Sequence, residues 1–390
     1  MSHCHIVPPY ILQALANDDD HEVAARARAA LAVDAQVRAE RRAEPSLLPQ
    51  GSLPVPDGGG GPHRVISDAK GRTTTPGTTV RREGDPATGD VAVDEAYDGL
   101  GDTWTFWEQA YGRDSLDGHG LALLGTVHYG QSYDNAFWDG TQMVFGDGDG
   151  VIFNRFTISV DVIGHELAHG VTSYTANLRY AGQSGALNES MSDVFGSLVK
   201  QLARSQDAAT ADWLIGEGLL AAGVNGRALR DMLNPGTAYD DPRLGKDPQP
   251  ADMSGYVVTS SDNGGVHINS GIPNRAFALA AQAIGGPAWT VAGQVWWDVV
   301  SGGQIRTDCD FATFARLTVA AAAARYGDGS APHQSVLTAW QTVGVLTATG
   351  RRSVRATRAA RATGAAAASP SDLPSGETSV LVRRTGGFAG

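Results

Sequence analysis

Cysteine is scarce in this sequence of 390 residues, and no long apolar run occurs. The two cysteines, Cys4 and Cys309, exclude a disulfide framework as the basis of stability. No apolar run comes near the roughly 20 residues that a membrane-spanning helix needs, so we predict no membrane span. The first residues lack the basic and apolar segments of a secretory signal peptide, and we therefore expect none.

Basic residues are also in the minority: 30 Lys and Arg stand against 42 Asp and Glu, which gives a formal net charge of −12. A nucleic-acid-binding surface needs clustered basic side chains on the folded part of a chain, so we expect no nucleic-acid partner. With 42% hydrophobic and 18% charged residues, the composition predicts a globular protein, which we expect to be a monomer. The length allows two domains.

Segments of unusual composition lie towards both ends of the chain. Residues 51–62 are rich in Pro and Gly, which predicts a linker after an N-terminal segment of residues 1–50. Within that segment, the Ala-rich stretch from His21 to Ala43 predicts one exposed or loosely packed helix. Residues 347–390 form a basic tail of low complexity, for which we expect a flexible tether.

The part between linker and tail shows two patterns. In residues 63–172, short apolar stretches alternate with turn signals as far as Asn154, which favours strands, and a central helix follows. In residues 173–346, apolar residues recur at the three and four spacing of helices. We predict an α+β fold in which a β-rich half precedes a helical half. The later helices are expected at Gly271–Ala283, Trp289–Val300, Phe311–Arg325 and His333–Val343.

The strongest chemical signal is the run HELAH, from His165 to His169, in a segment with helical periodicity. Four-residue spacing puts both imidazoles on one helix face, where they can share a metal ion. A catalytic zinc site has three protein ligands and an open position, so a third ligand is needed. Glu189 is the candidate, because it lies in a second helical pattern with 19 residues between it and His169.

The neighbours of these ligands suit hydrolysis. Glu166 is placed to accept a proton from a water molecule and to pass it towards the leaving nitrogen, while zinc polarises the scissile carbonyl. Asp193, one turn after Glu189, is placed to accept the N–H of a ligand histidine and so to orient it. An amphipathic helix can also carry the HExxH spacing by chance, but the downstream Glu and Asp in register argue against this alternative.

The stretch HELAHGVTSYTANLRYAGQSGALNESMSD resembles, without a gap, the active-site stretch of the thermolysin family of zinc metalloproteases. The similarity runs from about Leu100 to Val345. It implies a thermolysin-like two-domain fold with zinc in the cleft between the halves, and hydrolysis of internal peptide bonds. The residues implied are the zinc ligands His165, His169 and Glu189, the base Glu166, and Tyr180 as a hydroxyl donor to the tetrahedral intermediate.

Further segments extend the resemblance to substrate binding. The run YDNAFW is similar to the family's edge strand, which implies that Asn135 and Ala136 hold the substrate backbone as an added strand. The run SDNGGVHINSG implies that His267, oriented by Asp262, stabilises the developing oxyanion. Arg230 matches the family's arginine that contacts a substrate carbonyl, and the implied preference is a bulky apolar residue after the cut.

The sequence departs from the family pattern at the positions that bind calcium. Family members can hold two calcium ions beside the active-site helices with clustered carboxylates, and Asp161, Asp212 and Glu217 remain at matching positions. Lys200 and Leu214, however, stand where the family has Glu, and Ca²⁺ needs about six to eight oxygen ligands. We therefore doubt a calcium site and expect the ammonium of Lys200 to replace the calcium charge.

The run CHIVPPYIL, which begins at Cys4, resembles the propeptide motif of the protealysin-like branch of the family. The resemblance implies that residues 1–50 are an inhibitory or chaperone propeptide of a self-processing zymogen. As a thiolate, Cys4 could take the open zinc position of the precursor, or it could be a small apolar residue in a docking segment. Cleavage near Leu47 or Leu48 would suit an enzyme that prefers apolar residues after the cut.

Alternatives stay open for the tail, the location and the activity. From Ser379 onward the tail is similar to the opening of emfourin-type protein inhibitors, while a flexible tail is the simpler interpretation. The family resemblance favours secretion, whereas the missing signal peptide favours a cytoplasmic enzyme. A zinc aminopeptidase would carry a GxMEN motif, which the sequence lacks, and an inactive zinc-binding protein would lack Glu166 or His267.

Overall fold

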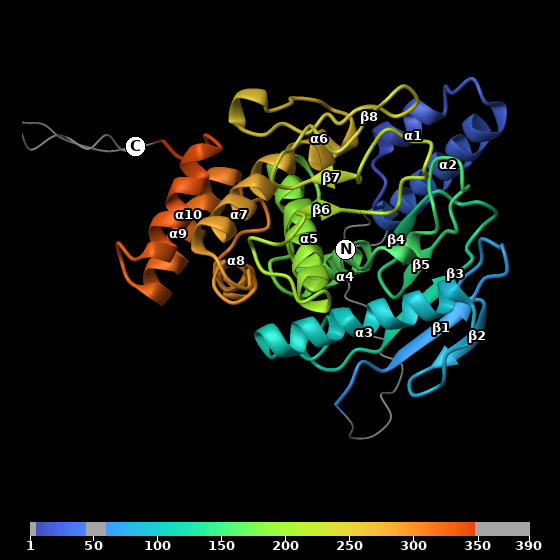
Figure 1. Ribbon diagram of the computed structural model, residues 1–390, viewed down its shortest axis with the longest axis horizontal. Helices are drawn as coiled ribbons and strands as arrows, with labels where there is room; N and C mark the ends of the chain where they lie inside the picture. Colours follow the sequence, from blue (N-terminus) through green and yellow to red (C-terminus); the bar gives the residue numbers. More distant parts are fainter. Residues whose placement is uncertain (1–4, 44–59, 348–390) are drawn as a thin grey trace, which may run out of the picture. The chain divides into compact units, whose positions relative to one another are not determined.

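The computed structural model of the protein describes residues 5–43 and 60–347, except for the side chains of residues 36–43 (Figure 1). Cys4, most of the predicted linker, the cleavage region and residues 348–390 of the predicted tail lie outside the described residues. Among the described helices, none contains a stretch that is both long and apolar enough to cross a bilayer.

A five-stranded sheet lies in the N-terminal half, where the turn-rich pattern predicts strands. The strands are β1 (Arg64–Asp68), β2 (Thr78–Arg82), β3 (Leu123–Val127), β4 (Ala136–Trp138) and β5 (Met143–Phe145), in the order β2-β1-β3-β5-β4. The inner strands run parallel, whereas β2 and β4 pair antiparallel with their neighbours. Because β4 is an edge strand, its outer side offers unpaired backbone groups to a further strand.

The sequence pattern missed helix α3 (Val91–Tyr111), which packs along β1 and β3 (Figure 1). The Asp90 side chain caps its first turn by accepting hydrogen bonds from two backbone N–H groups. The glycines inside α3 are poor helix formers, and this hides the helix in the sequence. One of them gives room to a neighbour, since a Cβ on Gly99 would lie 2.3 Å from Cδ1 of Ile163 and would force that side chain to move.

Two central helices, α4 (Val160–Tyr174) and α5 (Gly182–Ala203), carry the predicted metal ligands. They follow the short 3-10 helix η1 (Phe156–Ile158) and are buried over most of their length. A Cβ on Gly196 of α5 would lie 2.4 Å from the backbone oxygen of Asp161 in α4. Glycine at this position therefore lets the two helices approach closely, which sets the spacing of the side chains between them.

The C-terminal half is helical, as predicted. Its helices are η2 (Met253–Gly255), α6 (Asp262–Asn269), α7 (Gly271–Ile284), α8 (Ala292–Ser301), α9 (Phe311–Tyr326) and α10 (Ala331–Thr342). Two small antiparallel sheets pair β6 (Leu214–Ile215) with β7 (Arg230–Asp231), and β8 (Asp240–Asp241) with β9 (Gly245–Lys246). Trp296 and Trp340 stack with ring centroids 6.0 Å apart, and Phe277 and Phe314 pack edge-on against Trp296. Aromatic side chains thus fill the core of this half.

The N-terminal segment forms α1 (Pro9–Leu15) and α2 (His21–Ala43). In α2, Val23, Ala27 and Ala30 are each 1% exposed and belong to the main hydrophobic core. The prediction of an exposed or loosely packed helix is wrong for this face, because small side chains at helical spacing let it pack closely. Asp18, in the turn before α2, also forms a bidentate ion pair with Arg243 at 2.6 and 3.1 Å.

Candidate active site

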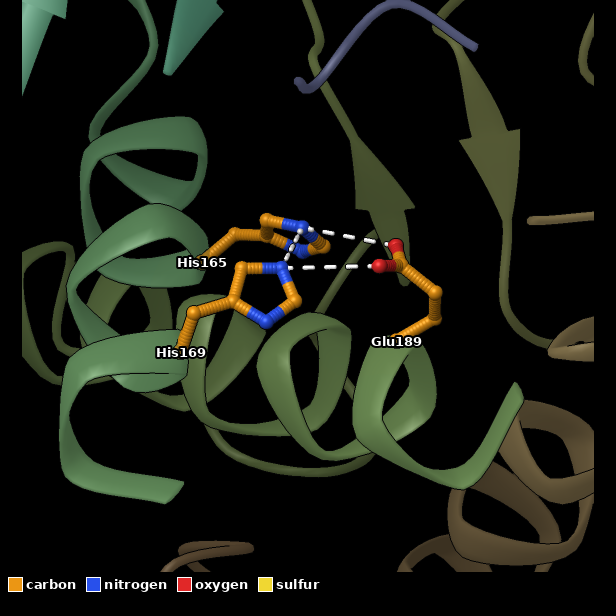
Figure 2. Close-up of side chains that lie close together, drawn as sticks. All are labelled: His165, His169 and Glu189. Atoms are coloured by element: carbon orange, nitrogen blue, oxygen red, sulfur yellow. Dashed lines mark hydrogen bonds and ion pairs between the residues drawn. The ribbon is translucent and has the colours of Figure 1, made fainter. Parts of the chain in front are cut away.

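The two central helices bring the three predicted ligands together (Figure 2). His165 Nε2 lies 3.1 Å from His169 Nε2, and the Glu189 carboxylate lies 3.6 Å from the first nitrogen and 3.5 Å from the second. One ligand atom from each residue lies within 4.8 Å of the others, and all three side chains are buried. This clustering is what the four-residue spacing and the downstream Glu predict.

The orientation of the imidazoles fits a bound cation. His165 Nδ1 is 2.8 Å from Asp193 Oδ1, and His169 Nδ1 is 2.7 Å from Asn188 Oδ1. Because both partners are oxygen acceptors, each Nδ1 is the donor, and the Nε2 lone pairs point to a common space. Two imidazole nitrogens and a carboxylate around such a space are the donor set of a catalytic zinc site.

Asn188 is a site residue that the sequence analysis missed. Its Nδ2 donates to the backbone oxygen of Leu178 at 3.1 Å, which fixes the amide so that Oδ1 accepts from His169. The available signal was its position directly before Glu189 on a predicted helix. An Asn at that position has many other uses, so the fold was needed to identify its partner.

Burial and charge set the protonation states of the ligands. Burial lowers the pKa of His169 to about 3, so its imidazole is neutral at physiological pH. Burial also acts to raise the pKa of Glu189, but electrostatic interactions with the surrounding imidazoles and with Arg230 outweigh it and lower that pKa to about 2. A neutral imidazole and an ionised carboxylate are the forms that bind a metal.

Glu166 lies beside the ligands without joining them. Its Oε2 accepts a hydrogen bond from the backbone N–H of Trp138 in β4 at 3.1 Å, while Oε1 is buried and has no hydrogen-bond partner within residues 5–43 and 60–347. Burial and the negative charge of Glu189 raise the pKa of Glu166 well above its ordinary value. A buried carboxylate with one oxygen left for a water molecule suits a general base.

His267 and Tyr180 reach the same centre from the helical half. His267 Nδ1 is 2.6 Å from Asp262 Oδ1, as predicted for an oriented imidazole, and the Tyr180 hydroxyl lies 3.3 Å from His267 Nε2. The same hydroxyl donates to Glu189 Oε1. The turn that carries Asp262 has four successive positive φ angles, 51°, 50°, 92° and 76°, and its last two residues are glycines, which adopt such angles without strain.

The predicted substrate-binding strand binds the chain's own N-terminal segment. The Ile6 N–H donates to the backbone oxygen of Ala136 at 3.1 Å. The side chain of Asn135 binds both backbone groups of Val7. Its Oδ1 accepts from the Val7 N–H at 3.0 Å, and its Nδ2 donates to the Val7 carbonyl at 3.4 Å. The segment therefore adds a short strand to the open side of β4.

Arg230 joins this segment to the metal ligands. Its Nη1 donates to the Ile6 carbonyl at 3.3 Å, and its Nε and Nη2 donate to the two oxygens of Asp193 at 2.9 and 2.8 Å. Asn274 of α7 adds a bond of 2.8 Å to the same carboxylate. Burial acts to raise the pKa of Asp193, but Arg230 and His165 outweigh it and hold the pKa well below its usual range. One carboxylate thus orients both a zinc ligand and the backbone-binding arginine.

Lys200 occupies the position predicted to replace calcium. Its Nζ lies 2.8 Å from Asp161 Oδ2, 2.8 Å from Asp212 Oδ1 and 2.6 Å from the backbone oxygen of Leu214. Glu217 turns instead to Arg204, at 2.8 Å. The ammonium group has the oxygen partners that its three protons need.

A buried His-His-Glu ligand set with an adjacent glutamate, beside an edge strand that binds peptide backbone, defines a zinc metallopeptidase. Residues 62–173 match the thermolysin metallopeptidase catalytic domain, and residues 176–345 match the alpha-helical domain of the same metallopeptidases. The chain belongs to the thermolysin family of metallopeptidases.

Known relatives agree with this assignment. An extracellular metalloprotease of Pectobacterium carotovorum subsp. carotovorum is 51% identical over 343 residues, which cover 88% of this chain and 96% of the relative. A thermolysin of Alicyclobacillus acidocaldarius is 40% identical, over 71% of this chain and 50% of the relative. The solved precursor of protealysin, a metalloproteinase from Serratia proteamaculans, is 53% identical with a TM-score of 0.80, and the match covers 88% of this chain and all of that one.

The chain is therefore a thermolysin-like, zinc-dependent metallopeptidase that hydrolyses peptide bonds, in the form of a zymogen with its propeptide. The family, the two-domain fold with a strand-containing first half, and the zymogen form are confirmed predictions.

Proposed function

We propose that the propeptide keeps this zymogen inactive by lying in the substrate site in the direction of a substrate, with Ile6 at the position that follows the scissile bond. The observation that carries the proposal is the backbone clamp on Ile6 and Val7 by Asn135, Ala136 and Arg230. These bonds use only main-chain groups of the bound segment, so a peptide of another sequence can make them too.

For the mature enzyme, we assign a role to each residue around the metal. His165, His169 and Glu189 would hold the zinc ion, which would polarise the scissile carbonyl and lower the pKa of a water molecule. Glu166 accepts the water proton through Oε1 and delivers it to the leaving nitrogen. His267, held by Asp262, and Tyr180 donate hydrogen bonds to the oxygen on which negative charge develops. Each such donor contributes about 100-fold to 1000-fold in rate.

The preference of the enzyme follows from the bound segment. Ile6 is 0% exposed, and its carbonyl is held by Arg230. A bulky apolar residue directly after the cut is therefore our proposed preference. Cleavage of the linker near Leu47 or Leu48 by the enzyme itself would meet this preference and separate residues 1–50 from the mature part.

Cys4 lies outside the described residues and comes directly before His5 in the sequence. Because zinc favours sulfur ligands, we keep the hypothesis that a Cys4 thiolate takes the open zinc position of the precursor, with a small apolar docking residue as the alternative. Replacing Cys4 by Ser should then raise the activity of the uncleaved precursor, and unchanged precursor activity would remove Cys4 from the mechanism.

Other parts of the proposal rest on composition, relatives or geometry. The names of relatives support export to the cell exterior. The contacts of Lys200 support an ammonium group in place of calcium. We retain residues 63–172 and 173–346 as the two catalytic domains, a monomeric state, and an emfourin-type inhibitor, to which the tail is similar, as a partner besides peptide substrates.

The central experiment is cleavage of a blocked internal peptide by the matured protein. We expect activity that a zinc chelator removes and added zinc restores. Glu166→Gln should lower kcat/KM by at least about 100-fold, because it removes the proton acceptor. Glu108→Gln, which changes an exposed glutamate on α3, serves as the matched control and should leave kcat/KM unchanged. Full activity of Glu166→Gln would refute the assignment of the base.

A further inference from the structure

The propeptide's Arg26 marks a charged site next to the substrate strand. Arg26 lies in α2, and its Nη2 is 3.5 Å from Asp149 Oδ2, a carboxylate with a fully buried side chain. Asp149 Oδ1 accepts hydrogen bonds from the backbone N–H groups of residues 151–153 at 2.7 to 3.1 Å. The turn therefore satisfies one carboxylate oxygen, and the other faces the cation of the propeptide.

A second carboxylate, Asp134, belongs to the same site. It is 3% exposed, and its Oδ1 has no hydrogen-bond partner among the described residues. Burial and the negative charge of Asp149 raise the pKa of Asp134 to about 8, against the lowering effect of Arg26. Backbone hydrogen bonds tie the turn to the segment just before β4, from the N–H of Gly148 to the oxygen of Tyr133 at 3.2 Å and from the N–H of residue 146 to the oxygen of residue 135 at 3.0 Å.

The register of the bound segment relates these acids to a substrate. His5 pairs with Phe137 in an antiparallel bridge, so each step forward along the segment is one step back along β4. β4 begins at Ala136, and counting on from this bridge past the start of the strand sets residue 8 of the segment against Asp134. Since Ile6 follows the scissile position, residue 8 is the third residue after it. Side chains at paired positions lie on the same face, with Cβ atoms about 5 Å apart. An arginine or lysine side chain at residue 8 of a bound peptide would therefore be long enough to reach the carboxyl groups of Asp134 and Asp149.

In the propeptide itself, position 8 is a proline, and the chain turns into α1 at Pro9. The cation is therefore supplied from α2 by Arg26, which leaves with the propeptide after cleavage. Removal of Arg26 leaves the two carboxyl groups without their cationic partner. A positive group of a bound substrate can take its place, because a cation close by favours the charged form of Asp134.

We propose that Asp149 and Asp134 form a subsite of the mature enzyme for an arginine or lysine side chain at the third residue after the scissile bond. This subsite rests on the proposed function and adds a second determinant of substrate preference. The first determinant is the apolar residue directly after the cut, and the second is a positive charge two residues further on.

The test compares blocked peptides that differ only at this third position, cut by the matured enzyme at low salt. A peptide with Arg should show a kcat/KM about fivefold higher than the same peptide with Gln, and the ratio should fall as salt screens the pair. Asp149→Asn should bring the ratio below twofold. Its amide oxygen can still accept the three backbone N–H bonds of the turn, so the substitution removes charge and keeps the fold. Asp134→Asn provides a second, independent variant, which should also lower the ratio.

Asp139→Asn is the matched control, because Asp139 also caps a turn, accepting from the N–H groups of Thr141 and Gln142 at 2.8 and 2.9 Å. It follows the opposite end of β4, and its substitution should leave the Arg-to-Gln ratio unchanged. Cleavage of the Gln peptide without an advantage for Arg would overturn the subsite and leave the proposed function standing. Failure to cut either peptide would overturn both, and an Arg preference that persists in both Asn variants would overturn the subsite alone.

Discussion

Replacing Lys200 by Met removes an ammonium group from a buried cluster of oxygens. Lys200 is 1% exposed, and Asp161, its partner at 2.8 Å, is fully buried. Opposing charge on Asp161 and Asp212 outweighs burial and raises the pKa of Lys200, so the group is charged throughout the neutral pH range. Without it, the carboxylate of Asp161 is left buried and uncompensated. Breaking a buried pair in this way costs about 3–5 kcal/mol of unfolding free energy.

The assay is urea unfolding of the full chain in a Glu166→Ala background, which prevents self-digestion, with tryptophan fluorescence as the signal. The Lys200→Met variant should lose about 3–5 kcal/mol relative to this background. Lys246→Met, which changes an exposed lysine of β9, is the matched control and should change stability by about 0.5 kcal/mol or less. A loss below about 1 kcal/mol for Lys200→Met would refute the assigned role of the ammonium group.

A second substitution tests the relation to calcium directly. Lys200→Glu returns a carboxylate to the cluster, and clustered carboxylates are the ligands that Ca²⁺ prefers. The urea midpoint of this variant should be low without calcium and should rise when calcium is added. The unsubstituted lysine form should show no such rise. Equal calcium responses of the two forms would mean that Lys200 does not replace the ion.

Three further predictions concern single positions. His128 lies between Asp147, at 2.9 Å, and Asp90, at 3.1 Å, and these charges raise its pKa although burial lowers it. The stability lost in His128→Asn should therefore be largest below the ordinary histidine pKa of about 6.5 and should vanish as pH rises above the raised pKa, as measured by urea unfolding across pH. Asn188→Ala should weaken zinc binding about 10-fold to 100-fold in competition with a chelating dye. Gly196→Ala should cost about 1–3 kcal/mol in urea unfolding, because its Cβ overlaps α4.

The residues that could be predicted from the sequence share one property: their spacing along a helix determines which face they occupy. His165 and His169 lie one turn apart on α4, and the helical pattern that carries Glu189 extends to Asp193. The helices α7, α9 and α10 could be predicted for the same reason, since apolar residues recur at helical spacing between Gly, Pro and Asp boundaries.

Other features depend on contacts between distant segments, which local patterns do not encode. Helix α3 contains glycines at positions where side chains from distant segments, Ile163 and Arg64, pack against it, and these glycines make its sequence resemble that of a turn-rich region. Arg26 and Asp149 are 123 residues apart in the sequence, and no local motif around either residue predicts that they form a pair. The role of Asn188 becomes apparent only when the structure shows that its Oδ1 lies against Nδ1 of His169.

In the proposed mechanism, the same polar groups of the catalytic part bind the propeptide and the substrate, and this limits how the zymogen can be activated. Asn135, Ala136 and Arg230 bind main-chain atoms of Ile6 and Val7, so a change that loosened them would release the propeptide and weaken substrate binding together. Contacts outside this clamp, such as the ion pair of Asp18 with Arg243, add affinity for the propeptide alone. Cutting the linker separates the two functions, because it turns the propeptide from a tethered neighbour at high effective concentration into a free ligand that dilution can remove.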